Sequence, residues 1–205
     1  MLAKEGYPFI LSALVAAILF YIIPWYIWVT LSLLLLALFI WFFRDPERNT
    51  PIESDIAVSA ADGKVVEVQE VEFEGEKYKK VGVFMNVFSV HVNRTPVSGT
   101  VESIRHIAGK FVNASRPDAS IINERNIVTF NTEYGKVIAV QVAGLVARRT
   151  VSYVKEGDLM ATGDRFGMIK FSSRVDHYFP MNAEIMVKED DEVKAGESII
   201  AKLTK

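Results

Sequence analysis

The sequence predicts a mainly β protein: a compact barrel or sandwich domain, of the barrel-sandwich-hybrid kind, with an N-terminal hydrophobic helical hairpin. Three observations lead to this prediction. Residues 6–43 contain no charged side chain, and 32 of these 38 residues are apolar. The rest of the chain forms many short apolar runs separated by turn residues, a pattern typical of barrels and sandwiches. A segment of the second part also occurs twice in similar form.

The apolar leader, residues 1–43, is predicted to associate with a membrane. One straight helical crossing needs about 20 apolar residues, so this tract is just long enough for two short helices. Pro24 lies near its middle, where a helix would break, and we expect helices over residues 9–23 and 25–43. A cleavable signal peptide fits poorly, because the tract is too long and lacks a cleavage site.

The charges that flank the leader indicate its orientation. Lys4 precedes the hairpin, and Arg44 and Arg48 follow it among acidic residues. Positively charged flanks favour the cytoplasmic side of a membrane. We therefore expect a cell-membrane protein whose second domain, residues 44–205, lies on the cytoplasmic face.

The second domain is expected to contain ten strands, taken in the order of the apolar runs. Asp62-Gly63 and Tyr134-Gly135 supply hairpin-type turns between them. Two stretches, residues 88–91 and 143–147, hint at helical turns. The strands are expected over residues 57–60, 64–71, 78–85, 99–107, 127–132, 135–142, 149–154, 167–171, 183–187 and 198–202.

The internal repeat supports this architecture. Lys155-Glu-Gly-Asp-Leu-Met-Ala-Thr-Gly163 aligns with Lys188-Glu-Asp-Asp-Glu-Val-Lys-Ala-Gly196. Each copy has an acidic turn, an apolar residue, and a glycine before the next strand. This predicts two related β-turn units, as in lipoyl-type domains, although no lysine sits on a hairpin tip that would carry lipoate or biotin.

Composition excludes several classes of function. The chain has 23 Lys and Arg against 25 Asp and Glu, so no excess of cations is available for nucleic acid. The absence of cysteine excludes disulfides and thiolate chemistry. The histidines, His91, His106 and His177, have no zinc-site spacing, and no nucleophile elbow or phosphate-binding glycine loop occurs. We expect neither a metal nor a nucleic-acid partner.

Three polar features stand out within apolar surroundings: Asp62, His91 and the pair Ser172-Ser173. Each alone has an ordinary structural explanation, as a turn, a satisfied buried histidine and a bend. A serine hydroxyl becomes a nucleophile when a base takes its proton, and a histidine held by a carboxylate is the usual base.

These features belong to ordered motifs that resemble the phosphatidylserine decarboxylases, in particular the short form that includes the archaetidylserine decarboxylases. The resemblance covers nearly the whole chain. The motifs are Arg44-Asp-Pro-Glu-Arg48, Ala61-Asp-Gly63, His91-Val-Asn-Arg-Thr-Pro96, Gly109-Lys-Phe-Val-Asn-Ala114, Asn123-Glu-Arg125, and Gly167-Met-Ile-Lys-Phe171 followed by Ser173-Arg-Val-Asp176.

The resemblance implies a self-cleaving proenzyme, a zymogen of phospholipid biosynthesis. Ser173 would attack the carbonyl of Ser172, and the chain would separate there into a β chain, 1–172, and an α chain, 173–205, that stay together as a heterodimer. Residue 173 would become a pyruvoyl group, the only cofactor implied. That group forms a Schiff base with the serine amine of the lipid and draws electrons as carbon dioxide leaves.

The resemblance also assigns roles to the polar residues. His91 would be the base and Asp62 its orienting partner. Arg94 and Arg174 are candidates to bind the phosphate or carboxylate of phosphatidylserine or archaetidylserine, and each is equally explained as a structural arginine. The apolar leader suits such a membrane-lipid substrate, because it would hold the site at the depth of the head groups.

Ser172 departs from the family pattern, which usually has glycine before the nucleophilic serine. A Cβ at this position hinders both the strained backbone and the attack on the carbonyl, so cleavage is expected to be slow or blocked and this chain to persist as a precursor. Two alternatives stay open: a non-catalytic membrane-anchored barrel-sandwich module, and a degenerate member that binds serine phospholipids without turnover. The oligomeric state is also open, with a homodimer as one option.

Overall fold

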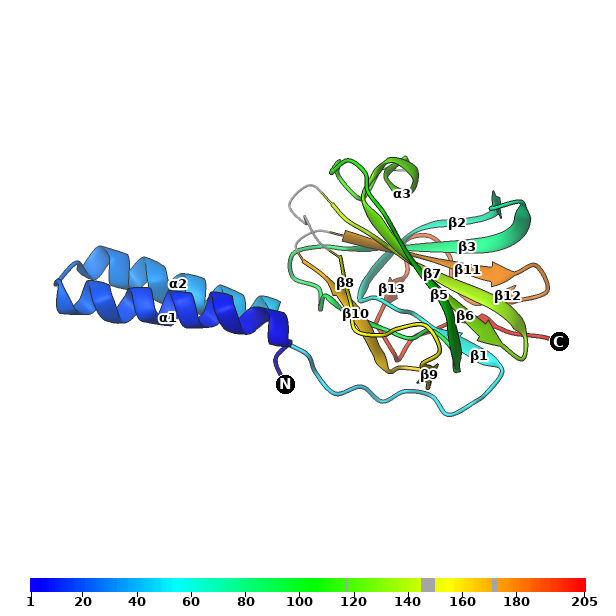
Figure 1. The fold of residues 1–205 in the computed structure, drawn as a ribbon, viewed down its shortest axis with the longest axis horizontal. Coiled ribbons are helices and arrows are strands. Elements are labelled where there is room, and N and C mark those ends of the chain that lie inside the picture. The colour runs from blue at the N-terminus through cyan, green and yellow to red at the C-terminus, as the bar shows by residue number, and fades with distance from the viewer. Residues whose placement is uncertain (117, 145–149, 171–172) are drawn as a thin grey trace. The chain divides into compact units, whose positions relative to one another are not determined.

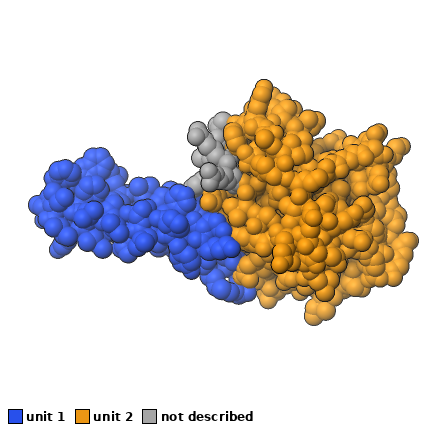
Figure 2. Space-filling model, viewed as in Figure 1, with its two compact units in different colours: residues 1–47 blue, residues 48–205 orange. Residues whose placement is uncertain are grey.

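A computed structural model describes residues 1–116, 118–144, 150–170 and 173–205. The chain divides into two compact units, residues 1–47 and 48–205 (Figure 2). Each unit is described by itself below.

The first unit is the expected apolar helical hairpin. A short 3-10 helix, η1 (Lys4–Gly6), leads into α1 (Tyr7–Ile22), and α2 (Tyr26–Phe42) follows a turn that contains Pro24. The two ends of the hairpin are joined by a hydrogen bond from the N–H of Ala3 to the carbonyl of Phe43, 2.8 Å.

Most large side chains of the hairpin are apolar and exposed. The helical stretch Lys4–Ile22 is long and apolar enough to cross a membrane, and Tyr26–Phe42 is a shorter apolar helix. Length and composition thus favour membrane association of this unit.

The second unit is mainly β, which confirms the predicted fold class. Its one described helix, α3 (Ala119–Ile122), is a single turn. The strands are β1 (Ile56–Val58), β2 (Gly63–Phe73), β3 (Glu76–Met85), β4 (Val92–Arg94), β5 (Gly99–Ile107), β6 (Arg125–Thr132), β7 (Gly135–Val142), β8 (Thr150–Ser152), β9 (Leu159–Met160), β10 (Arg165–Ile169), β11 (Ser173–Pro180), β12 (Glu184–Ile185), β13 (Glu192–Val193) and β14 (Ile199–Lys202).

The strands form one large sheet and two small ones. The large sheet is curled and has the order β13-β2-β3-β11-β7-β6-β5-β9 (Figure 1). The small sheets have the orders β1-β14-β12 and β4-β10-β8. β11 therefore lies between β3 and β7, and all its described neighbours run antiparallel to it.

The two faces of the large sheet differ in what they bury. Alternate residues of a strand point to opposite faces, so Val175 and Phe179 of β11 join the main hydrophobic core on the inner face. Tyr178 packs on the outer face with Ile127 and Val140 in a smaller cluster. This alternation decides on which face each polar residue of β11 lies.

The two copies of the repeat fold alike, as predicted. In the first, the N–H of Lys155 donates to the carboxylate of Asp158 at 2.9 Å, and in the second, that of Lys188 donates to Asp191 at 3.0 Å. Both repeat glycines adopt a left-handed backbone conformation, with φ of 85° at Gly163 and 75° at Gly196. A Cβ on Gly196 would stand 3.6 Å from Cα of Gly163, so the two turns pack against each other.

Several expectations about the strands and turns need correction. The short strands β4, β9 and β13 were not expected, and Asp62-Gly63 joins strands of two different sheets and is not a hairpin turn. The sequence assigned no strand to Ser173–Pro180, which is the eight-residue β11. It placed a helical turn near residues 88–91, where the chain makes a turn and then enters β4. Of the helical stretch expected over residues 143–147, residues 143 and 144 are not helical and the others lie outside the described residues.

Candidate active site

Ser173 begins β11 and is fully buried on the inner face of the large sheet. Its hydroxyl donates to the thioether of Met85, which lies opposite on β3, with Oγ and Sδ 3.9 Å apart. Ser172 lies outside the described residues. A serine hydroxyl in these apolar surroundings needs a base before it can act as a nucleophile.

His91 is fully buried at the entrance to β4. Its Nδ1 lies 2.9 Å from the carbonyl oxygen of Ser89. A carbonyl only accepts, so Nδ1 carries a proton, and Nε2 is the nitrogen that can act as a base when the ring is neutral. The backbone carbonyl of His91 accepts from the N–H of Ile169, 3.3 Å, at the end of β10. The chain then runs only four residues from Ile169 to Ser173, so backbone pairing ties His91 to the segment that contains the serine.

Asp62 has other partners than the histidine. Its two carboxylate oxygens each lie 2.8 Å from Nη2 of Arg48, and its Oδ1 accepts the N–H of Ala195, also at 2.8 Å. Nδ1 of His91 is directed instead to the carbonyl of Ser89. The expected contact between Asp62 and His91 therefore stays a prediction.

The internal repeat explains part of the environment of Asp62. In one half of the domain Asp62 accepts the N–H of Ala195, and in the other half the hydroxyl of Ser98 accepts the N–H of Thr162 at 2.9 Å. The two acceptors thus hold equivalent turns. Asp62 differs from Ser98 by its charge, which it uses to bind Arg48.

Arg94, a candidate for substrate binding, packs against the repeat turns. Nη1 donates to the carbonyl of Gly163 at 2.9 Å, and a Cβ on Gly196 would come 2.7 Å from its Cδ. Only 6% of the residue is exposed. Its stem therefore stabilises the junction of the two turns.

Arg174, the other candidate, lies on the outer face in a buried cluster of four charged side chains. Its guanidinium pairs with Asp176 and Glu67. Lys80 lies 3.1 Å from Glu67 and 3.4 Å from Asp176. Gly82 lies opposite Asp176 on one side and Glu67 on the other, and its missing Cβ leaves the space that the guanidinium fills.

The other two histidines differ in burial. His106 is exposed. His177 is fully buried on β11, where Nδ1 donates to the carbonyl of Val81 at 2.9 Å and Nε2 accepts the N–H of Ala60 at 2.8 Å. Burial, which disfavours the charged ring, lowers the pKa of His177 to about 4. His177 is thus a neutral structural bridge from β11 to residue 60, next to the Ala61-Asp62 turn.

A chain of three buried amides, which the sequence did not single out, crosses the inner face. Nδ2 of Asn126 donates to Oε1 of Gln141 at 3.0 Å, and Nε2 of Gln141 donates to Oδ1 of Asn93 at 2.8 Å. One sequence signal marks Gln141: it stands at a position of β7 where the same face otherwise buries Val137 and Ala139. A polar residue that continues an apolar series in a strand is thus a sequence signal for a buried amide.

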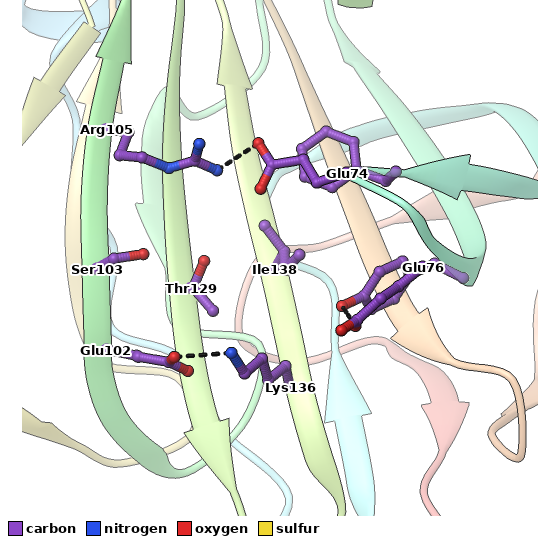
Figure 3. Close-up of a pocket in the computed structure, with 10 residues that line it drawn as sticks. Glu74, Glu76, Glu102, Ser103, Arg105, Thr129, Lys136 and Ile138 are labelled. Carbon is purple, nitrogen blue, oxygen red and sulfur yellow. Dashed lines mark hydrogen bonds and ion pairs between the residues drawn. The ribbon is translucent and has the colours of Figure 1, made fainter.

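A pocket lies on the outer face, at the other end of the large sheet (Figure 3). Ion pairs join Arg105 to Glu74 and Lys136 to Glu102 across it. Tyr78, also in its lining, pairs with Pro180, the last residue of β11, whereas Ser173 is the first. This pocket is therefore remote from the serine.

Within the part of the chain that the structure describes, no three His, Asp or Glu side chains gather where they could hold a metal ion. The described site residues are a serine, a histidine and amides, which suit proton transfer and hydrogen bonding.

Comparisons with known proteins agree with the sequence motifs. The phosphatidylserine decarboxylase family model matches residues 35–201. The chain is also 46% identical over 208 aligned residues to a phosphatidylserine decarboxylase proenzyme of Magnetococcus marinus, and the alignment covers 99% of this chain and 95% of that protein.

Proposed function

Because the chain belongs to the phosphatidylserine decarboxylase family, we propose that it removes the serine carboxylate of phosphatidylserine to give the ethanolamine phospholipid and carbon dioxide. The reaction site is the buried start of β11, and the active protein is made from this chain by self-cleavage between Ser172 and Ser173. The position of Ser173 supports the proposal most, since it is buried beside Met85 and only four residues from the backbone partner of His91.

Self-cleavage is a rearrangement of the peptide bond before residue 173. Oγ of Ser173 bonds to the carbonyl carbon of Ser172, the C–N bond breaks, and the freed amine takes the hydroxyl proton, leaving an ester. Nε2 of His91 is the proposed carrier of that proton. Elimination then removes the Cα proton of residue 173 to a base and breaks the Cβ–Oγ bond, which leaves Ser172 with a free carboxylate and residue 173 as dehydroalanine. Hydrolysis of the resulting dehydroalanine consumes water and releases ammonia.

Position 173 suits the pyruvoyl group that this sequence of bonds would leave. The group is smaller than a serine residue with its amine, and the site is enclosed on the inner face with β3 on one side and β7 on the other. When bound there, a pyruvoyl group supplies an electron sink for loss of a carboxylate. His91 would deliver the proton that replaces the carboxylate, and the apolar core beside Met85 would exclude water from it.

The hairpin of residues 1–47 is proposed to keep the protein at its lipid substrate. The cationic flanks Lys4 and Arg44 favour the cytoplasmic face of the cell membrane. Archaetidylserine carries the same head group and is a second substrate that the site would accept.

Two measurements test the proposal. On a denaturing gel, the Ser172→Gly variant should separate into fragments 1–172 and 173–205, and the smaller should have the mass of its sequence minus ammonia. The cleaved protein should release carbon dioxide from phosphatidylserine vesicles, and Ser173→Ala should do neither. An intact chain from the glycine variant under all conditions would favour the non-catalytic module, and cleavage without carbon dioxide would favour a lipid binder.

A further inference from the structure

The three buried amides on the inner face form a directed chain. Asn126 and Gln141 lie directly opposite each other on β6 and β7, and Asn93 comes from β4 in another sheet. At each of the two links an NH2 group donates to the carbonyl oxygen of the next amide. The chain therefore has a polarity, and it ends on the NH2 group of Asn93.

The end of the chain reaches two residues beside the reactive serine. Nδ2 of Asn93 lies 3.8 Å from Sδ of Met85 and 3.4 Å from the carbonyl oxygen of Ala60. Sδ of Met85 is also the partner of the Ser173 hydroxyl, 3.9 Å away. The thioether is thus held between the last amide and the nucleophile.

Ala60 links the chain to the other elements of the site. Its carbonyl accepts from Asn93 and from the N–H of Arg94, 2.9 Å, while its N–H donates to His177. The amide chain thereby fixes the segment between β1 and Ala61-Asp62, as well as the thioether.

Burying three amides in the core is energetically risky, so efficient packing alone does not explain why they are there. Asn126, Gln141 and Asn93 expose 4%, 0% and 0% of their surface. A buried amide that loses one hydrogen bond costs about 1–3 kcal/mol, whereas apolar side chains would fill the same core without that risk. Fully satisfied buried networks are rigid and define one arrangement of their neighbours.

Gly167 shows that the neighbouring strand leaves space for the chain. A Cβ on Gly167 would stand 2.7 Å from Nε2 of Gln141. Gly167 lies on β10, the strand that runs toward the cleavage bond and pairs with Asn93 of β4. A larger residue here would displace the amide that orients Asn93.

We propose that Asn93, oriented by Gln141 and Asn126, is a positioning residue for Ser173 that acts through Met85 and Ala60. The inference rests on the proposed self-cleavage. Its NH2 group keeps the thioether and the Ala60 carbonyl in place, so that the serine hydroxyl is held in one orientation toward the peptide carbonyl and the base. A small misplacement of reacting groups lowers a rate by up to about 100-fold.

The test measures the self-cleavage rate of folded protein in a Ser172→Gly background. Gln141→Met keeps the length of the side chain and removes the donor to Asn93, and we expect cleavage to slow by about 10- to 100-fold. The plateau of the rate against pH should fall while its midpoint stays unchanged, because the base itself is not altered. If Gln141→Met folds poorly, Asn126→Leu/Gln141→Met replaces the whole cross-strand pair with apolar side chains.

Val140→Ala is the matched control, since Val140 is the neighbour of Gln141 on the opposite face. It should lower stability and leave the cleavage rate of the folded fraction unchanged. Equal rates in the background and in the folded amide variants, or a displaced midpoint with an unchanged plateau, would overturn the positioning role alone. An uncut background chain would instead overturn the self-cleavage, and the positioning role with it.

Discussion

The guanidinium of Arg174 lies over Gly82, in the space that a side chain at that position would occupy. A Cβ on Gly82 would come 2.8 Å from Cζ of Arg174 and 2.9 Å from a carboxylate oxygen of Asp176. Gly82 on β3 therefore makes room for the ion cluster, because it has no side chain between Glu67 of β2 and Asp176 of β11.

Gly82→Ala is expected to destabilise the domain through this close approach. The added methyl group must displace the guanidinium from its carboxylates, and overpacking of this kind costs about 1–3 kcal/mol. Chemical denaturation of the purified protein measures the loss. Lys77→Ala, at an exposed position of the same strand, is the control and should change stability by less than about 0.5 kcal/mol. Equal stability of the two variants would show that the cluster rearranges freely.

Asp176→Asn should be one of the most destabilising single changes in the domain. It leaves Arg174 and Lys80 with one fewer carboxylate in a buried cluster, and breaking a buried pair costs about 3–5 kcal/mol. The comparison is Asp190→Asn, which removes an exposed pair with Lys64 and should change stability far less, because water screens exposed charges. Urea titration of both variants measures the difference, and similar midpoints would contradict the structural role of the cluster.

The free energy of unfolding should fall as the pH drops from about 6.5 toward 4, because of His177. In the folded protein burial lowers its pKa to about 4, whereas the unfolded histidine takes up a proton near 6.5. The contribution of neutral His177 to the free energy of unfolding is complete above pH 6.5. It is lost as the pH falls toward 4, because the histidine of the unfolded state takes up a proton first. The interval between the two pKa values corresponds to about 3 kcal/mol.

His177→Gln removes this titration and is the variant with which to measure it. The difference in unfolding free energy between the natural chain and the variant should depend on pH only between about 4 and 6.5. A constant difference across that range would mean that the folded histidine titrates normally.

His91→Ala and Asp62→Asn should each leave the chain uncut in the Ser172→Gly background. The first removes the proposed base, and the second removes the charge that binds Arg48 while keeping an oxygen that can accept the N–H of Ala195. His106→Ala, at an exposed position, should cleave at the rate of the background. Normal cleavage in either site variant, followed on a denaturing gel, would remove that residue from the proposed mechanism.

The sequence was sufficient to predict the helical hairpin and most strands of the large sheet, because their apolar residues follow clear patterns. The ranges expected for β5 and β7 agree with the structure at both ends. The repeat could also be predicted from the sequence, because each copy has an aspartate three residues after its lysine, and both aspartates accept the N–H of that lysine.

β11 was missed because its polarity follows tertiary contacts and not an alternating pattern. Arg174, Asp176 and His177 look like surface residues in the sequence, yet each is at most 1% exposed. Their partners come from distant strands: Glu67 from β2 and Lys80 and Val81 from β3. The local sequence does not reveal those partners. Burying a charge without a partner is unfavourable, so the charged residues of this segment argue against a buried strand.

The place of β11 in the sheet has a consequence for the proposed cleavage. Residues 173–205 supply β11 to β14, which pair with strands in two of the three sheets. Withdrawal of this tail would split the large sheet and leave β3 and β7 with bare edges of unsatisfied backbone groups, the kind of edge that promotes aggregation. If the chain is cut before Ser173 as proposed, strand pairing would retain the tail, and maturation would require no dissociation or refolding.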